Sequence, residues 1–258
     1  MNTLTVRSRA KITFFASIFL TGLVFIGPRP ALAAEMLFAV DQFPPYQYLT
    51  PDGEARGSSY EVVRAVFERL GMPIKVKFLP WKRAVSNARN GIATGIFSCG
   101  YKKERESFVL FSKPISFATK GVIVRKTYSG PPISVLADLV HVHVHVGAVA
   151  GFAANKFLDK AGVSFDKVPK IDNVIPMLAN NRFDALYLTL ETGQFLAAEA
   201  GMAAAFKYVP LKDFALRPYH MCFSKKWPGY RELTAKFNTA LGELQANGRV
   251  EAIYAKYS

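Results

Sequence analysis

Short apolar runs alternate with amphipathic segments along the chain after residue 35. We predict strands at 36–40, 74–79 and 95–99, and the first of these is a short apolar run. Helical spacing of Val62, Val63, Val66, Phe67 and Leu70 predicts a helix over 58–70, opened by a Ser58–Glu61 capping box. A second helix is expected over 81–90. Gly71 and Gly91 are suited to end these helices. This order is typical of a largely parallel sheet covered by helices.

The middle of the chain repeats the alternation. Strands are expected at 140–146, 163–168, 185–189 and 206–209, a loop at 147–151, and helices at 152–160 and 172–181. Two extended segments, 121–125 and 220–224, bracket this block, and apolar stripes predict closing helices at 232–244 and 250–257. We therefore expect two α/β lobes, one from 34–120 together with 214–258, and the other from 121–213.

The first 33 residues have the order of a secretory signal peptide. Arg7, Arg9 and Lys11 precede an apolar stretch from 12 to 26, which is followed by prolines and by small residues with A-x-A spacing. A membrane anchor is the alternative, but the apolar stretch is shorter than the roughly 20 residues that a spanning helix needs. We expect cleavage of 1–33 and a soluble protein in the periplasm.

The amino-acid composition and the net charge exclude some classes of protein. The chain is 50% hydrophobic and 13% aromatic, which excludes an intrinsically disordered protein. Its net charge of +14 is compatible with a polyanion partner, and removal of four basic leader residues leaves +10. The basic residues are scattered singly or in pairs, and no nucleic-acid-binding motif is present. We expect no nucleic-acid partner and interpret the charge as mostly solvated surface.

A series of short motifs has the order and spacing of one known family. Each motif is weak alone, but together they cover nearly all of the mature chain: Phe43-Pro44-Pro45-Tyr46, Gly53…Gly57, Pro80-Trp81, Glu104-Arg105, Phe111-Ser112-Lys113-Pro114, Gly147–Gly151, Arg182-Phe183-Asp184-Ala185 and Asn247-Gly248. The chain resembles family 3 of the bacterial periplasmic solute-binding proteins, the polar-amino-acid class.

The resemblance implies a fold and a function. The fold would be α/β, with two lobes of the type II periplasmic-binding-protein kind, a hinge, and a ligand in the cleft between the lobes. The function would be the substrate-binding protein of an ABC importer, which carries an amino acid or a related small polar carboxylate to an inner-membrane permease. We expect a monomer without enzymatic activity, cofactor or metal.

Arg105 is the strongest candidate for ligand binding. A guanidinium can donate two parallel hydrogen bonds to a carboxylate, and the alternative is a structural ion pair with a neighbouring glutamate. The resemblance places Phe43 and Trp81 over the ligand, although core packing is an alternative for both rings. Further candidates on the same lobe are main-chain groups near Gly100 and Tyr101, and the rings of Tyr46, Phe97 and Tyr101.

The chain departs from the family pattern at several ligand-facing positions. Lys102 and Lys103 stand where the family usually has threonine, and Phe152 and Ala153 stand where it has hydroxyls. Thr189 occupies the place of the aspartate that commonly meets the ligand's α-amino group. Glu191 is a candidate replacement if a turn brings it into the cleft. The resemblance thus predicts carboxylate recognition and leaves recognition of an ammonium group open.

The histidine pattern and the pair of cysteines each allow two interpretations. His141, His143 and His145 would share one face of the strand predicted at 140–146. One metal ion would rarely reach all three without a bend, so a half-solvated face is the better interpretation. Cys99 and Cys222 are either disulfide-bonded, as an oxidising compartment permits, or two buried thiols.

Two other function classes are compatible with such a scaffold. A periplasmic dehydratase acting on a small cyclic carboxylate would need a general acid or base in the cleft, for which Glu191 and the histidines are the candidates. A sensor domain of a signalling protein is the third reading. No nucleophile elbow, metal-ligand motif or phosphate loop favours an enzyme.

Overall fold

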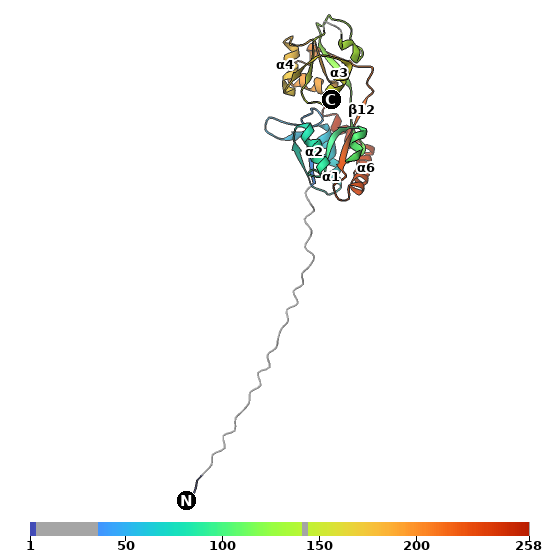
Figure 1. Ribbon diagram of the computed structural model, residues 1–258. Coiled ribbons are helices and arrows are strands. Elements are labelled where there is room, and N and C mark those ends of the chain that lie inside the picture. The colour runs from blue at the N-terminus through green and yellow to red at the C-terminus, as the bar shows by residue number, and fades with distance from the viewer. Residues whose placement is uncertain (4–35, 141–143, 258) are drawn as a thin grey trace. The chain divides into compact units, whose positions relative to one another are not determined.

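Two five-stranded mixed sheets organise the chain from Met36 onward (Figure 1). The computed structural model describes residues 1–3, 36–140 and 144–257. His141, His143 and the predicted leader, apart from its first three residues, lie outside the described part. Among the described residues, no helix is both long and apolar enough to cross a membrane.

The first sheet combines strands from both ends of the chain. Its order is β4 (Ile74–Phe78), β1 (Met36–Val40), β5 (Gly95–Gly100), β12 (Arg217–Ser224) and β6 (Val109–Ala118). The strands β4, β1 and β5 run parallel, whereas β12 is antiparallel to both of its neighbours. The predicted parallel βαβαβ unit is thus present, extended by an antiparallel pair.

Helices cover both faces of this sheet, which explains why β1 is apolar at every position. Phe38 points into a core shared with α1 (Ser58–Arg69), α6 (Tyr230–Ala246) and α7 (Arg249–Tyr254). The next residue, Ala39, packs on the opposite side with α2 (Trp81–Asn90). Alternate side chains of a strand point to opposite faces, so a strand covered on both faces has no polar position. Gly91 has φ 76° and ends α2, as predicted.

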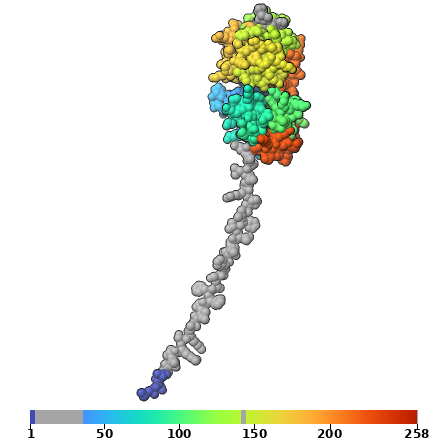
Figure 2. Space-filling model, in the orientation of Figure 1, coloured from blue at the N-terminus to red at the C-terminus, as the bar shows by residue number. Residues whose placement is uncertain are grey.

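The second sheet is built from the middle of the chain. Its order is β11 (Phe206–Pro210), β7 (Lys120–Arg125), β10 (Ala185–Thr189), β8 (Val146–Val149) and β9 (Phe165–Val168). The helices α3 (Asn155–Ala161), α4 (Val174–Ala179) and α5 (Leu190–Glu199) alternate with its strands. In Figure 2 the residues near 150–180 gather at one end of the folded part, and the residues near 70–100 and 240–258 gather at the other.

Short elements complete the fold. A two-stranded ribbon pairs β2 (Tyr48–Leu49) with β3 (Ala55–Arg56). Four 3₁₀ turns are η1 (Lys103–Ser107), η2 (Leu136–Val140), η3 (Ile171–Asn173) and η4 (Ala203–Ala205). The chain passes from β6 of the first sheet to β7 of the second at Thr119, and returns through residues 211–216. Backbone hydrogen bonds fix this junction, since Leu190 N donates to Thr119 O and Leu211 N donates to Lys120 O, both at 3.0 Å.

Three sequence-based predictions need correction. The strand expected at 140–146 is wrong, because β8 begins only at Val146 and η2 occupies the residues up to Val140. Gly147 was expected in a loop but lies within β8, where a Cβ atom would come within 2.6 Å of the Phe183 ring. The capping box is also wrong. The side chain of Glu61 instead accepts hydrogen bonds from Tyr257 and Lys256 at the far end of the chain.

The long strand β6 was not predicted. Pro114 lies in its middle and cannot donate a hydrogen bond to a sheet. A proline is tolerated there because β6 is an edge strand with β12 as its neighbour in the sheet. The edge position could not be read from local sequence, since it depends on the order of strands far apart in the chain.

Candidate ligand-binding site

A cavity lies between the two sheets and receives side chains from both. It encloses about 630 Å³, including the space that is open to solvent. The first sheet and its connections contribute Asp41, Phe43, Trp81, Ser98, Gly100, Lys102, Arg105, Arg217 and Tyr219. The second sheet and its connections contribute Lys120, Phe152, Ala153, Ala154, Lys156, Phe157 and Thr189. A molecule in this cavity would contact both halves of the protein.

The 3₁₀ turn η1 positions Arg105 on the cavity wall. Arg105 is the middle residue of η1, and only 7% of its surface is exposed. Its guanidinium donates to the carbonyl oxygen of Gly100, and its Cζ lies 5.2 Å from the centre of the Trp81 ring. Lys102 lines the same cavity.

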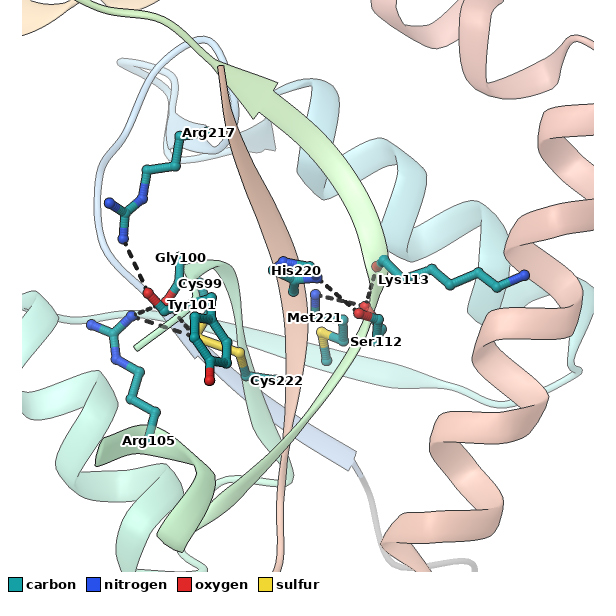
Figure 3. The surroundings of a disulfide bond; sticks show 10 residues. All are labelled: Cys99, Gly100, Tyr101, Arg105, Ser112, Lys113, Arg217, His220, Met221 and Cys222. Atoms are coloured by element: carbon teal, nitrogen blue, oxygen red, sulfur yellow. Dashed lines mark hydrogen bonds between the residues drawn. A yellow bond between two sulfur atoms is a disulfide. The ribbon is translucent and has the colours of Figure 1, made fainter. Parts of the chain in front are cut away.

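A disulfide between Cys99 and Cys222 braces this wall (Figure 3). It joins β5 to β12 with the Cα atoms 6.2 Å apart, which decides between the two predicted possibilities in favour of a bond. The Nη1 of Arg105 lies 3.7 Å from Cys99 Sγ. On the other side of the same strand end, Arg217 Nη2 donates to the carbonyl oxygen of Tyr101 at 3.4 Å. The bond therefore fixes the strand end that carries the contacts of both arginines.

Gly100 lets Arg217 approach the strand end closely. A Cβ atom at this position would come within 2.5–2.9 Å of the Arg217 guanidinium. The absence of a side chain is therefore what leaves room for this cation beside Arg105. Burial, followed by the charge of Arg217, lowers the pKa of Arg105 to about 10.

Lys120 is the corresponding buried cation of the second sheet. It begins β7, is 6% exposed, and places its Nζ 3.4 Å from Thr189 Oγ1. Burial lowers the pKa of Lys120 to about 8, with a contribution in the same direction from Arg217 and an opposing one from Glu191.

Asp41 is the acidic residue of the cavity. It follows β1 and faces Arg105 from η1 and Tyr219 from β12. Burial raises the pKa of its carboxyl group to about 7, although hydrogen bonding and the charge of Arg105 act in the opposite direction. The carboxyl group therefore holds its proton over much of the range in which an exposed aspartate has lost it.

This raised pKa predicts a pH-dependent stability. In the unfolded chain Asp41 loses its proton near pH 4, whereas the native protein keeps it until about pH 7, so folding takes up a proton between these values. Stability is therefore expected to fall as the pH rises through this window. Urea denaturation at pH 5, 6, 7 and 8 should show the wild type losing stability relative to Asp41→Asn, which mimics the protonated group. A difference that stays constant with pH would contradict the assignment.

Aromatic rings form the apolar part of the site. Phe43 stacks on Tyr46 with ring centres 4.7 Å apart, and Tyr219 meets Phe43 edge-on at 5.6 Å. Phe152, which belongs to the other half of the protein, also meets Phe43 edge-on, at 6.0 Å. This last contact joins the two halves directly across the cavity.

Five of the nine predicted ligand-binding residues line the cavity: Arg105, Phe43, Trp81, Gly100 and Thr189. The other four lie elsewhere. Phe97 is in the core of the first sheet, and Tyr101 is half exposed with its hydroxyl donating to Glu106. Tyr46 is buried behind Phe43 and donates to the carbonyl oxygen of Phe117. Glu191 belongs to the first turn of α5, where both of its carboxylate oxygens accept from Thr119 N.

Several residues of the cavity were missed in the sequence. The main ones are charged: Asp41, Lys120, Lys156 and Arg217. Asp41 directly follows a predicted strand and Lys120 directly precedes a predicted extended segment, which was the available signal. Arg217 stands three residues before the segment predicted at 220–224. Of the three histidines predicted to share a strand face, His141 and His143 lie outside the described residues. His145 is exposed and lies 3.1 Å from Asp166.

Comparisons with known proteins agree with this architecture. The family model for bacterial extracellular solute-binding proteins, family 3, matches residues 36–258. A protein of Pseudomonas aeruginosa named L-arginine-binding protein is 25% identical over 232 residues, which cover 83% of this chain and 84% of the relative.

Solved structures share the fold. A histidine kinase sensor domain with similarity to periplasmic binding proteins superposes with a TM-score of 0.74 at 22% identity, over 87% of this chain and 96% of that one. A Streptococcus pneumoniae ABC uptake transporter substrate-binding protein with bound histidine gives 0.74 at 18% identity, over 86% and 92%. The fold is the two-lobe, type II periplasmic-binding-protein fold, and the chain belongs to family 3 of the bacterial extracellular solute-binding proteins.

Proposed function

We propose that this protein is the periplasmic substrate-binding component of an ABC importer and captures an amino acid or a related small polar carboxylate. The lobe built on the first sheet and the lobe built on the second sheet, which includes Lys120 as the first residue of β7, would close on the solute. A ligand that contacts both lobes favours the closed state by its difference in affinity between the closed and open states. An inner-membrane permease would then recognise the closed form.

The observation that carries the proposal is the environment of Arg105. Its guanidinium is almost fully buried on the cavity wall, and it forms no ion pair with any carboxylate in the described part of the chain. A buried cation without a carboxylate partner is costly unless a ligand supplies one. Its fork of donors suits a carboxylate group.

The family relationship supports binding rather than catalysis. The related proteins are named for the binding of amino acids or for a sensor domain. Glu191, proposed above as the general acid or base of a dehydratase, does not line the cavity and is hydrogen-bonded to Thr119. We therefore propose a non-enzymatic protein that acts as a monomer and exchanges its solute with a membrane permease.

Substitution of Arg105 tests the proposal. A thermal-shift screen of L-amino acids and small organic acids would first identify a stabilising carboxylate. In calorimetry, Arg105→Ala is expected to weaken its binding by about 100-fold or more, because a buried charge loses its partner. Arg105→Lys keeps the charge but loses the planar fork, and should weaken binding by about tenfold.

The matched control is Arg89→Ala. Arg89 is an exposed residue of α2 that lies over the Phe108 ring but does not line the cavity. Its replacement should leave the affinity unchanged. Unchanged affinity in both Arg105 variants, with cooperative melting retained, would remove Arg105 from the site.

A further inference from the structure

The charges that line the cavity are strongly unequal. Five cationic side chains face it, namely Lys102, Arg105, Lys120, Lys156 and Arg217. Asp41 is the carboxylate among the lining residues, and burial raises its pKa. The lining side chains of the described chain therefore include five basic groups and one acidic group.

Nearby carboxylates do not neutralise these cations. Among the described residues, none of the five forms an ion pair within 4 Å of an aspartate or glutamate. Glu191 lies near Lys120 but is held by Thr119 N, and Glu104 near Arg105 is exposed to solvent. Burial and then the charges of Arg105, Lys156 and Arg217 lower the pKa of Lys102, whereas Glu104 acts in the opposite direction. Such a cluster is unfavourable in the absence of an anion.

The cations come from both halves of the protein. Lys102, Arg105 and Arg217 belong to the first sheet and its connections, whereas Lys120 starts β7 and Lys156 lies on α3. One small anionic group at Arg105 would leave the cations of the other half without a partner. A ligand with two anionic groups would place one of them against the cations of each half of the protein.

The space between the charges is lined by rings. Trp81 and Phe43 stand on one side, and Phe152 and Phe157 on the other. Aromatic rings favour contact with an apolar or flat carbon frame rather than with a third charged group. An ammonium group would meet Thr189, which is uncharged and contacts Lys120, rather than a carboxylate.

We propose that this cavity selects a small dianion with an anionic group near each end of an apolar frame, in preference to zwitterionic or cationic amino acids. The inference rests on the proposed function and narrows its substrate class. It also separates this chain from its relative named for L-arginine, because five cations in the cavity repel a guanidinium ligand.

The test is calorimetry with ligands that differ in charge at similar size. Glutarate, adipate and terephthalate carry two carboxylates and no ammonium group, whereas L-glutamine, L-arginine and benzoate carry one carboxylate. At least one dianion is expected to bind about 30-fold or more tighter than every ligand with one carboxylate. A smaller preference, or tighter binding of L-glutamine, L-arginine or benzoate, would overturn the inference and leave the proposed function intact. No binding by any of the three dianions would overturn the inference. Absence of any stabilising amino acid or organic acid in the thermal-shift screen would overturn the proposed function as well.

Adjacent lysines supply a matched pair of variants. Lys102 lines the cavity, whereas its neighbour Lys103 is exposed and does not. Lys102→Gln should weaken binding of the preferred dianion by about tenfold and bring its affinity closer to that of the ligand with one carboxylate. Lys103→Gln should change neither value. Equal effects of the two substitutions would show a diffuse surface attraction and overturn the assignment of Lys102 to the site.

Discussion

The double variant Cys99→Ala/Cys222→Ala is expected to unfold with a free energy about 4–5 kcal/mol below that of the oxidised wild type. The disulfide joins residues 123 positions apart, and a cross-link that closes so long a loop removes much of the conformational freedom of the unfolded chain. Both sulfur atoms are fully buried, so the alanines add a small packing loss. Urea denaturation followed by tryptophan fluorescence is a suitable measurement. The two tryptophans, Trp81 and Trp227, both pack with the first sheet that the bond braces.

Reduction of the wild-type protein is the control for the cross-link itself. In the presence of a reductant, the free energy of unfolding of the wild type should fall towards that of the double variant. The free energy of unfolding of the double variant should not change. A loss of less than about 1 kcal/mol in both comparisons would contradict a stabilising role for the bond. Ligand affinity is expected to fall as well, because the bond fixes the strand end that Arg105 contacts.

Phe237→Ala is expected to destabilise the protein by about 3–5 kcal/mol. The ring is fully buried on α6, with its centre 5.7 Å from that of Phe67 and 5.5 Å from that of Phe223. It thereby links two helices to the central part of the first sheet. Removal of a ring from such a position leaves a cavity that its neighbours fill only in part. The same fluorescence-detected denaturation measures the loss.

Thr239→Ala is the matched control for this substitution. Thr239 lies two residues further along α6 and is exposed to solvent. Its replacement should change the free energy of unfolding by no more than about 0.5 kcal/mol. Similar losses in the two variants would mean that α6 as a whole, rather than the ring, sets the stability.

Local signals explain which parts of the fold could be predicted. Helix ends at glycine depend on neighbouring residues alone, and Gly91 ends α2 as expected. Apolar runs such as β1 and β10 are strands because they are buried on both faces. The capping box failed because Glu61 is engaged by Tyr257, a partner 196 residues away that a local motif cannot register. Long-range contacts of this kind determine which partner a side chain takes, and local sequence patterns do not contain that information.

The same distinction applies to the site. Arg105 could be identified because a motif surrounds it and because its residue type suits a carboxylate. Asp41, Lys120 and Arg217 belong to no motif in the sequence. They line one cavity because β1, β7 and β12 end or begin beside it, and that proximity depends on strand order. The concentration of positive charge in the cavity is therefore a property of the folded chain, which the net charge of the sequence does not reveal.

The register of the last two strands of the first sheet has an evolutionary consequence. Ala118, at the end of β6, pairs directly with Arg217, at the start of β12. Everything between them leaves the first sheet and rejoins it at a single point, as a domain inserted into the turn of a hairpin does. The entropic cost of lengthening such a turn grows only with the logarithm of its length. A second lobe acquired at this position would have left the first lobe's strand pairing undisturbed while supplying the other wall of a binding site.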